Sequence, residues 1–217
     1  MTLAYPLSDP RTAQPASALT DAFERHGVRM TYARDEEVYA QDDQVELLYR
    51  VVRGVVRTSR LTADGRRQVG DFYYAGDIFG LEPGPEHRFA AEALDDCEII
   101  VVRRSAVRAF AGDAALDRAI LEATRQEMER LQEHVVMLGR KSARERVASF
   151  LMSIAQRQAD DHAHLPMGRQ DMADYLGLTI ETVSRMLTQL QGEAIVAFPS
   201  CRRFQVRKWT ALEALAA

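Results

Sequence analysis

Four polar side chains near the end of the chain fall on one face of an expected helix over residues 180–191. The spacing i, i+3, i+4, i+7 relates Glu181, Ser184, Arg185 and Thr188. An arginine can donate two hydrogen bonds to O6 and N7 of guanine, and a glutamate can accept one from the amino group of cytosine. Ser184 is short enough to approach a base such as thymine closely. The pattern favours base reading, although Glu181 and Arg185 also form the i, i+4 pair that any solvated helix can carry.

A second group of side chains suits contacts with phosphates. Polar and basic residues at the beginnings of helices and in turns typically hold the backbone of a nucleic acid. The candidates are Arg169, Gln170, Thr179, Thr182, Thr188, Arg202 and Arg203.

Two short helices around a glycine would position these groups. Residues 171–176 are expected to form the first helix, with Gly177 as its C-terminal stop. Thr179 can cap the second helix, in which Val183, Leu187 and Leu190 would pack inward. This is a helix-turn-helix pattern, and Ala173 is small where the helices would cross. The strand-like runs of "AIVAFPSCRRFQV" predict a β-hairpin, or wing, directly after it.

The rest of the chain divides into a strand-rich part and a long helix. After a short helix over residues 17–27, apolar runs with glycine turns continue to about residue 104 and predict a barrel or sandwich. Asp64-Gly65 marks one hairpin turn. Residues 113–138 then read as one helix, and Gly139 is expected to interrupt it.

An apolar seam runs along the expected long helix at steps of three and four residues. It either pairs two copies of the chain, which we favour, or packs on the chain's own barrel. Its members are Leu121, Thr124, Met128, Leu131, Val135 and Leu138.

Composition is consistent with two folded modules in a reducing cytoplasm. The chain has 217 residues, 47% of them hydrophobic, and a formal net charge of −4. From residue 139 onward there are 11 Lys and Arg against 8 Asp and Glu, and before it 17 Lys and Arg against 24 Asp and Glu. An acidic first part and a mildly basic second part suggest two modules, of which the second faces phosphate. Two distant cysteines cannot build a disulfide framework, and neither a signal peptide nor a membrane-length apolar run is expected.

With both halves read, the chain resembles the CRP/FNR family of bacterial transcription regulators over about residues 17–207. The most specific segment is "LGLTIETVSR", in which Glu181, Ser184 and Arg185 follow the E-x-x-S-R order of the FNR/FixK branch. CRP-like branches have Gly in place of Ser184 and Arg in place of Ile180. The resemblance implies a homodimer that binds a TTGA-N6-TCAA palindrome, contacts RNA polymerase and activates genes for low-oxygen or nitrogen-oxide metabolism.

The family also implies an α+β architecture. Residues 1–16 would be a flexible arm, and residues 17–111 a double-stranded β-helix, the jelly-roll barrel of cyclic-nucleotide-binding domains. Residues 112–139 would form the dimerisation helix and residues 140–217 a winged helix-turn-helix.

The segment that would bind a cyclic nucleotide departs from the family pattern. Gly76, Gly80 and Arg88 fit the frame, but Leu81 stands at the position of the ribose-binding Glu, and Phe89 replaces the phosphate-binding Ser. Glu82 is adjacent to that position. Because phenylalanine cannot donate to a phosphate and would fill the pocket, the pocket is interpreted as vestigial and cyclic AMP is not expected to bind. FixK-like members are often controlled by their own synthesis, which agrees with a degraded pocket. The alternative is an unidentified small effector in the barrel.

Other cofactors and an enzymatic role find little support. Two cysteines are too few for the four-cysteine iron–sulfur cluster of FNR. A haem ligand could come only from the scattered His26, His87, His134, His162 and His164. A metal-dependent barrel enzyme would need a His-x-His cluster inside the barrel, whereas His162 and His164 follow the domain boundary.

Cysteine chemistry leaves one further possibility. Cys97 lies in an apolar strand and is expected in the core, whereas Cys201 lies in the wing turn beside Arg202 and Arg203. Oxidation of Cys201 would place bulk or negative charge against phosphates and weaken DNA binding; the alternative is an inert surface cysteine.

Overall fold

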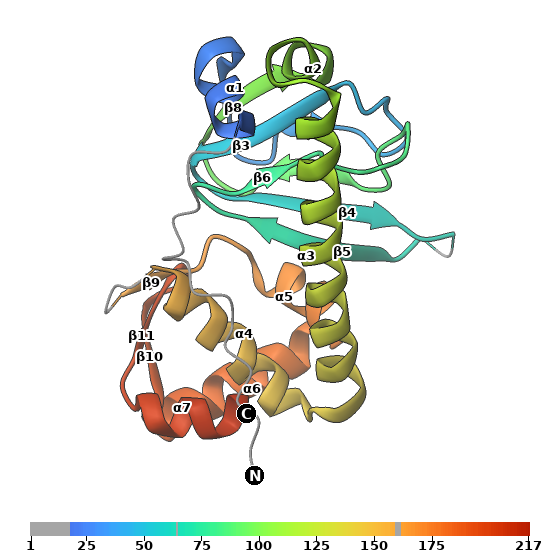
Figure 1. Cartoon of the computed structure of the whole chain (residues 1–217). Coiled ribbons are helices and arrows are strands. Elements are labelled where there is room, and N and C mark those ends of the chain that lie inside the picture. The colour runs from blue at the N-terminus through green and yellow to red at the C-terminus, as the bar shows by residue number, and fades with distance from the viewer. Residues whose placement is uncertain (1–17, 64, 159–161) are drawn as a thin grey trace.

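The computed structural model of the chain describes residues 18–63, 65–158 and 162–217. The arm expected over residues 1–16 and the turn residue Asp64 therefore lie outside the described residues. Figure 1 shows a β-sandwich above a mainly helical unit, with one long helix, α3, running beside both. Among the described residues, no helix is both long and apolar enough to cross a membrane.

The upper unit consists of two four-stranded antiparallel sheets, with strand orders β1-β8-β3-β6 and β2-β7-β4-β5. This confirms the jelly-roll barrel implied by the family resemblance. The strands are β1 Val28–Tyr32, β2 Glu37–Tyr39, β3 Leu47–Arg53, β4 Val56–Leu61, β5 Arg67–Tyr73, β6 Ile78–Phe79, β7 Ala90–Ala93 and β8 Cys97–Arg103.

The continuous apolar run "IIVV" lies within strand β8. Successive strand residues point to opposite faces of a sheet. Ile99 and Val101 join the apolar cluster inside the barrel, whereas Ile100 and Val102 pack with the helices on its outer face. Because both faces of β8 are covered, the strand has no polar face.

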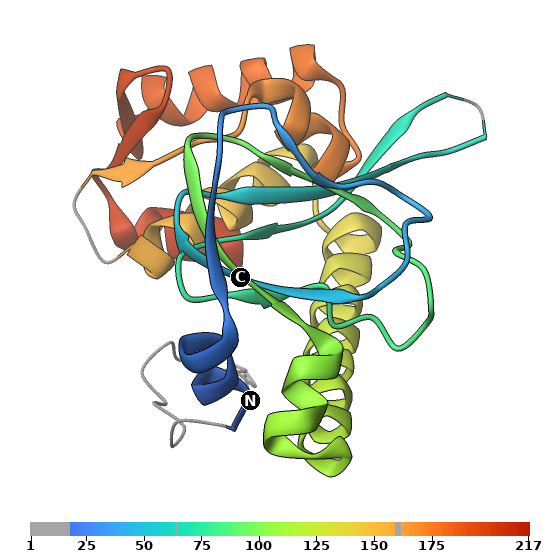
Figure 2. The ribbon, with the colours of Figure 1, turned by 90° about the horizontal axis from the view of Figure 1, so that it is seen from above.

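Helices cover one end of the barrel. Helix α1 (Ala18–His26) and helix α2 (Arg104–Ala111) lie together there with the beginning of α3 (Figure 2). Gly112 separates α2 from α3 (Asp113–Arg140) and has φ +83°, a conformation that L side chains rarely adopt.

The expected interruption of the long helix at Gly139 is wrong. Helix α3 continues through Gly139 to Arg140. The non-helical residues Lys141 and Ser142 then separate it from the next helix. A glycine is tolerated there because it occupies the last turn of the helix. The Arg146 guanidinium donates to the carbonyl oxygens of Leu138 (2.6 Å) and Lys141 (3.0 Å), which the helix end would otherwise leave unpaired.

The lower unit is a winged helix-turn-helix with additional elements. Its elements are α4 Ala143–Gln158, β9 Ala163–His164, α5 Arg169–Leu176, α6 Ile180–Gly192, β10 Val196–Ser200, β11 Arg203–Val206 and α7 Trp209–Ala216. Strand β9 extends the wing to three strands in the order β10-β11-β9. Helices α2 and α7 and strand β9 were not expected from the sequence.

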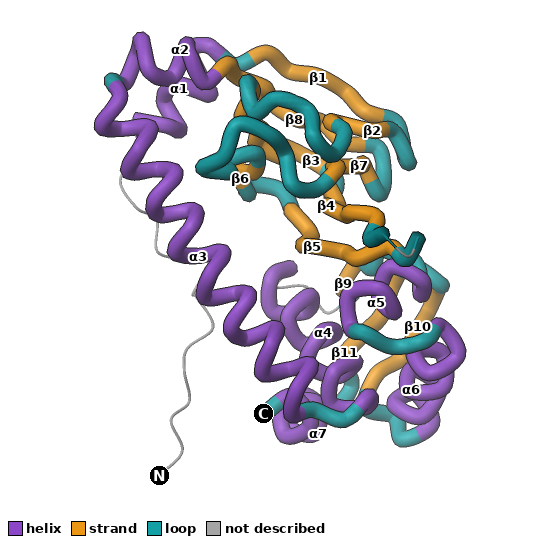
Figure 3. The backbone as a smooth tube through the Cα atoms, turned by 90° about the vertical axis from the view of Figure 1, so that its right-hand side faces the viewer, coloured by secondary structure: helices purple, strands orange, loops and turns teal. Residues whose placement is uncertain are grey.

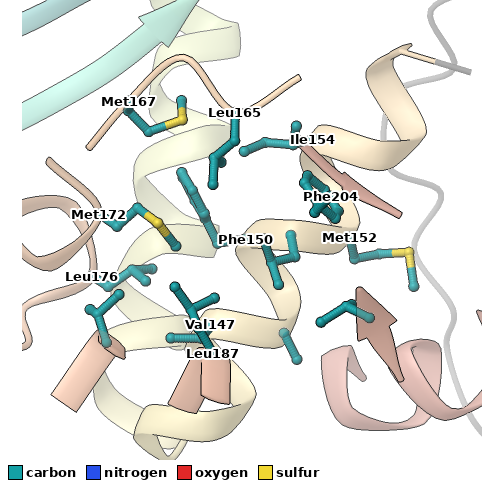
Figure 4. Close-up of a cluster of buried hydrophobic side chains, with 14 of the residues drawn as sticks. Val147, Phe150, Met152, Ile154, Leu165, Met167, Met172, Leu176, Leu187 and Phe204 are labelled. Carbon is teal, nitrogen blue, oxygen red and sulfur yellow. The ribbon is translucent and has the colours of Figure 1, made fainter. Parts of the chain in front are cut away.

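Buried side chains from all parts of the lower unit form one core (Figure 4). Val147, Phe150 and Ile154 project from α4 toward Leu187 of α6 and Phe204 of β11. Apolar side chains of this size each contribute roughly 1.5–3 kcal/mol when removed from water. This core holds α6 in place and leaves its opposite face exposed.

The barrel packs directly on the lower unit through the sheet that contains β4 and β5. Phe72 of β5 has its ring 5.9 Å from that of Phe150 and 5.4 Å from that of Tyr175. Val55 and Val69 belong to the same apolar cluster. In Figure 3, β5 lies directly above α5, and α6 lies below α5, farther from the barrel. The two units therefore share a continuous apolar contact.

Candidate nucleic-acid interface

The turn between α5 and α6 is built from a left-handed glycine and a capping threonine. Gly177 has φ +61° and ends α5, as expected from the sequence. The Thr179 hydroxyl accepts a hydrogen bond from the Thr182 backbone N–H at 3.3 Å and caps α6. Both helices are slightly longer than expected, since α5 begins at Arg169 and α6 ends at Gly192.

The inward and outward faces of α6 follow the expected division. Val183, Leu187 and Leu190 are buried in the core. Glu181 and Arg185 are exposed, while Ser184 is half-buried and its hydroxyl accepts from the Arg169 guanidinium at 3.1 Å. The backbone N–H of Glu181 and the Thr179 hydroxyl hold the pKa of the Glu181 carboxyl below its usual value. Glu181 is therefore an ionised acceptor near neutral pH.

The candidate phosphate residues flank α6 in two groups. Gln170, Thr179 and Thr182 line a groove of about 1110 Å³ between α5, the start of α6 and the β4–β5 hairpin. On the other side, Arg169 and Thr188 line a groove of about 510 Å³ between α6 and the wing. The phosphate candidates thus divide between the barrel side and the wing side of α6.

The wing supplies the remaining basic residues. Ser200 pairs with Arg203 across the β10–β11 hairpin, so Cys201 and Arg202 form its turn. Cys201 and Arg203 are exposed, and both Cys201 and Arg202 line the 510 Å³ groove beside Arg169. Cys97 is buried, as expected, where desolvation raises the pKa of its thiol to about 11.

Comparison with known proteins agrees with this geometry. Residues 145–215 match the Crp-like helix-turn-helix domain and residues 29–113 the cyclic nucleotide-binding domain. The nitrogen fixation regulation protein FixK of Azorhizobium caulinodans is 44% identical over 94% of this chain and 83% of its own length. FixK of Rhizobium meliloti is 40% identical, with 85% of each chain covered. The structure of FixK2 from Bradyrhizobium japonicum superposes with a TM-score of 0.83 and 44% identity over 88% of this chain and 98% of that one.

The chain belongs to the CRP/FNR family. It is a DNA-binding transcription regulator of the FNR/FixK type, in a family of regulators rather than enzymes. The helix-turn-helix over α5 and α6 is the DNA-binding element of this CRP/FNR protein.

The long helix of this CRP/FNR protein carries an open apolar face. The side chains of Leu121, Met128, Leu131 and Val135 are between 53% and 70% exposed. Val136 is also exposed, at 57%, although the sequence seam did not include it. The hydroxyl of Thr124 is bonded to the Ile120 carbonyl at 2.8 Å.

Leu138 differs from the rest of the seam. It is half-buried, and a Cβ at Gly177 would lie 3.3 Å from its Cδ2 atom. Leu138 therefore touches the helix-turn-helix of its own chain, whereas most of the seam faces away from it.

The residues of the expected vestigial pocket have contacts within the chain or are exposed. Glu82 is bonded through Oε2 to Nδ1 of the buried His87 at 3.1 Å. The His87 ring stacks on Tyr39 at 3.7 Å. Arg104 donates to the carbonyl oxygens of Gly80 (3.2 Å) and Glu82 (2.6 Å). Gly76 and Arg88 are exposed.

Phe89, which replaces the phosphate-binding Ser implied by the family resemblance, packs against β5. Its ring is half-buried, and a Cβ at Gly70 would come within 3.0 Å of it. The Arg60 guanidinium lies 5.8 Å from the Phe89 ring centroid. The Phe89 side chain thus packs between Gly70 of β5 and Arg60 of β4.

The histidines considered as haem ligands are dispersed. His26 contacts Phe110 at the end of the barrel, His134 of α3 contacts Tyr175, and His164 lies 4.0 Å from Asp95. His87 is committed to Glu82 and Tyr39, as described above. In the part of the chain that the structure describes, no three His, Cys, Asp or Glu side chains are grouped to hold a metal ion.

Two functional features were missed by reading the sequence. Arg146 joins the ends of two helices, because it also donates to the Leu176 carbonyl of α5 at 3.0 Å. Arg57 and Arg67 of the barrel form ion pairs with Asp171 of α5. Only the i, i+3 spacing of Asp171 and Asp174 at the start of α5 could have indicated a charged contact there.

Proposed function

We propose that this CRP/FNR regulator works as a cytoplasmic homodimer that binds a TTGA-N6-TCAA-like palindrome. The observation that carries the proposal is the exposed face of α6, where Glu181 and Arg185 project beside Ser184. Arginine suits guanine and glutamate suits cytosine, so the two half-sites would each present a G·C pair to this face.

Dimerisation would supply the second recognition helix. The exposed apolar side chains of α3 support pairing with a second copy of the chain, because an isolated helix would rarely leave so many of them in water. Two-fold operators place half-sites about 34 Å apart, which corresponds to about ten base pairs.

We further propose that the dimer activates genes for low-oxygen or nitrogen-oxide metabolism through contact with RNA polymerase. The relatives named nitrogen fixation regulation protein support a role of this kind. It would act without cyclic AMP, haem or an iron–sulfur cluster. The apolar ring of Phe89 and the Glu82–His87 contact favour this over an effector-switched barrel.

The experiment is fluorescence anisotropy with a labelled duplex that contains the palindrome. We expect the protein to bind it at least about 1000-fold more tightly than a duplex with both half-sites scrambled. Adding cyclic AMP should leave both affinities unchanged. Equal affinity for the two duplexes would refute sequence-specific reading, and a cyclic-AMP-dependent rise would refute effector-independent action.

A further inference from the structure

A charged cluster connects the barrel to the first helix of the helix-turn-helix. Arg57 lies on β4, and only 8% of its side chain is exposed. Its Nη1 donates to Oδ1 of Asp171 on α5, and its Nη2 donates to Oε2 of Glu92 on β7. The Asp171 side chain is only 11% exposed. A buried arginine therefore bridges one carboxylate from each unit.

A second arginine reinforces the contact from the β4–β5 hairpin. Arg67 donates from Nη2 to Oδ1 of Asp171 at 2.6 Å and from Nε to Oδ2 of Asp174 at 2.9 Å. The other Asp171 oxygen accepts from the backbone N–H of Gly168 at 3.0 Å, immediately before α5. Asp171 thus closes the N-terminus of α5 and ties it to the barrel through the same side chain.

The cluster lies one residue away from the DNA-contact candidates. Arg169 donates to Ser184 on α6 at 3.1 Å, and Gln170 donates to Asp174 at 2.6 Å. A rotation of α5 against the barrel would carry these side chains and α6 with it. The apolar contact around Phe72 resists separation of the units but is non-directional. Arginine–carboxylate pairs fix direction, because guanidinium donors and carboxylate acceptors are held in set geometries.

We propose that Arg57 is a positioning residue that sets the orientation of the helix-turn-helix relative to the barrel and α3. In the homodimer this orientation fixes the distance between the two α6 helices. The contact therefore holds the protein in its DNA-binding arrangement by ion pairs within the chain, without a bound effector. This inference rests on the proposed function as a dimeric DNA-binding protein.

Removing Arg57 would leave Asp171 as a poorly compensated buried charge and would relax the contact on the barrel side. Arg57→Met removes the charge at similar side-chain length. Asp171→Asn keeps an oxygen that can accept from Gly168 but removes the charge that faces Arg57. Arg29→Met is the matched control, because Arg29 pairs with Glu98 within the barrel, far from α5 in sequence and sheet position.

The test compares a full palindrome with a duplex that carries one half-site. A single half-site requires only one helix-turn-helix. The affinity of the protein for it therefore does not depend on the distance between the two α6 helices of the dimer. We expect Arg57→Met and Asp171→Asn to weaken binding to the full palindrome about tenfold, a typical size for coupling between sites. Half-site affinity should stay within about twofold, and Arg29→Met should match the wild type on both duplexes.

Each other outcome has a distinct meaning. Full-palindrome affinity that stays unchanged in both variants would overturn the positioning role. An equal loss on full and half sites would also overturn it, because it would indicate damage within the helix-turn-helix itself. If Arg57→Met does not fold, as judged by its thermal unfolding, Asp171→Asn decides the question. A wild-type protein that does not prefer the palindrome over scrambled DNA would instead refute the proposed function, and this inference with it.

Discussion

Arg169 at the start of α5 and Arg185 within α6 carry the same charge but have different surroundings. Arg169 is bonded to Ser184 and lines the groove between α6 and the wing. Arg185 is exposed and forms no ion pair within the described part of the chain. We therefore expect Arg169 to orient Ser184 and contact the DNA backbone, and Arg185 to contact a base.

Replacing Arg185 by alanine should remove base reading without disturbing the fold. We expect Arg185→Ala to lose about 1–3 kcal/mol of binding free energy on the palindrome and to tolerate substitution of the guanine it contacts. Titration of wild type and variant with matched and substituted duplexes measures both effects. Equal losses on specific and random DNA would show that Arg185 binds phosphate instead.

Cys201 presents a second residue-scale test. Because the side chain is exposed in the wing turn beside the 510 Å³ groove, a sulfenic or sulfinic acid there would meet DNA phosphates. We expect peroxide to weaken palindrome binding by the wild type and to leave Cys201→Ser unaffected in a mobility-shift assay. Unchanged wild-type affinity after peroxide would identify Cys201 as an inert surface cysteine. Cys97 is buried and should not react.

At the scale of elements, α3 has two different sides. One side packs on the barrel and on the lower unit, where Leu116 and Met137 contribute to their apolar clusters. The other side exposes the seam, including Leu131 at 53% and Val135 at 67%. Most of the seam therefore does not pack on the chain's own barrel, and its pairing with a second copy stays a prediction.

A charge in the seam should prevent dimerisation. Leu131→Asp would place a carboxylate in the apolar contact between two copies, whereas Gln132→Asp adds the same charge at the neighbouring exposed position. We expect Leu131→Asp to sediment as a monomer and to lose most of its affinity for the palindrome, with Gln132→Asp remaining dimeric. A Leu131→Asp protein that still sediments as a dimer would contradict the proposed seam.

The Asp71 carboxyl of strand β5 contacts Arg130 of helix α3 and has a shifted pKa. Burial raises the pKa of Asp71 to about 6, although Arg130 at 3.1 Å and the Phe72 backbone N–H partly oppose this. The folded-state pKa lies above the unfolded value, so the folded protein binds more protons between about pH 4 and pH 6. Asp71 therefore contributes most stability below pH 4 and loses that contribution as the pH rises through 6.

Replacing Asp71 by asparagine should remove this dependence. From pH 4 to pH 7 the free energy of unfolding of Asp71→Asn should rise relative to the wild type by up to about 3 kcal/mol. Thermal unfolding of both proteins at the two pH values measures the difference. A difference that is constant with pH would show that Asp71 keeps an ordinary pKa.

Periodicity in the sequence predicts elements where one face of a helix or strand is buried. Thr179, Gly177 and the apolar face of α6 could be placed in this way because their roles depend on neighbours within ten residues. Gly139 was misjudged because the glycine itself does not show that the Arg146 side chain pairs the carbonyl of Leu138 at the helix end. The Arg57–Asp171 contact joins residues 114 positions apart, and no local pattern encodes such a pairing.

At the scale of the molecule, three features bear on how the protein would bind DNA. Aromatic side chains pack inside the barrel, α3 exposes an apolar face, and the helix-turn-helix contacts the barrel through apolar side chains and ion pairs. Arrangement, rather than an added ligand, would then set the spacing of the two recognition helices. The helix-turn-helix could be predicted from local sequence, whereas its orientation depends on contacts between the two units.

The most direct test of this account is the affinity of the protein for palindromes that differ only in spacing. The six-base-pair spacer is compared with a spacer lengthened by five base pairs, which moves one half-site by about half a helical turn to the opposite face of the DNA. We predict that the longer spacer lowers affinity to that of a single half-site. Equal affinity for both spacings would contradict a dimer with two recognition helices held at a fixed separation.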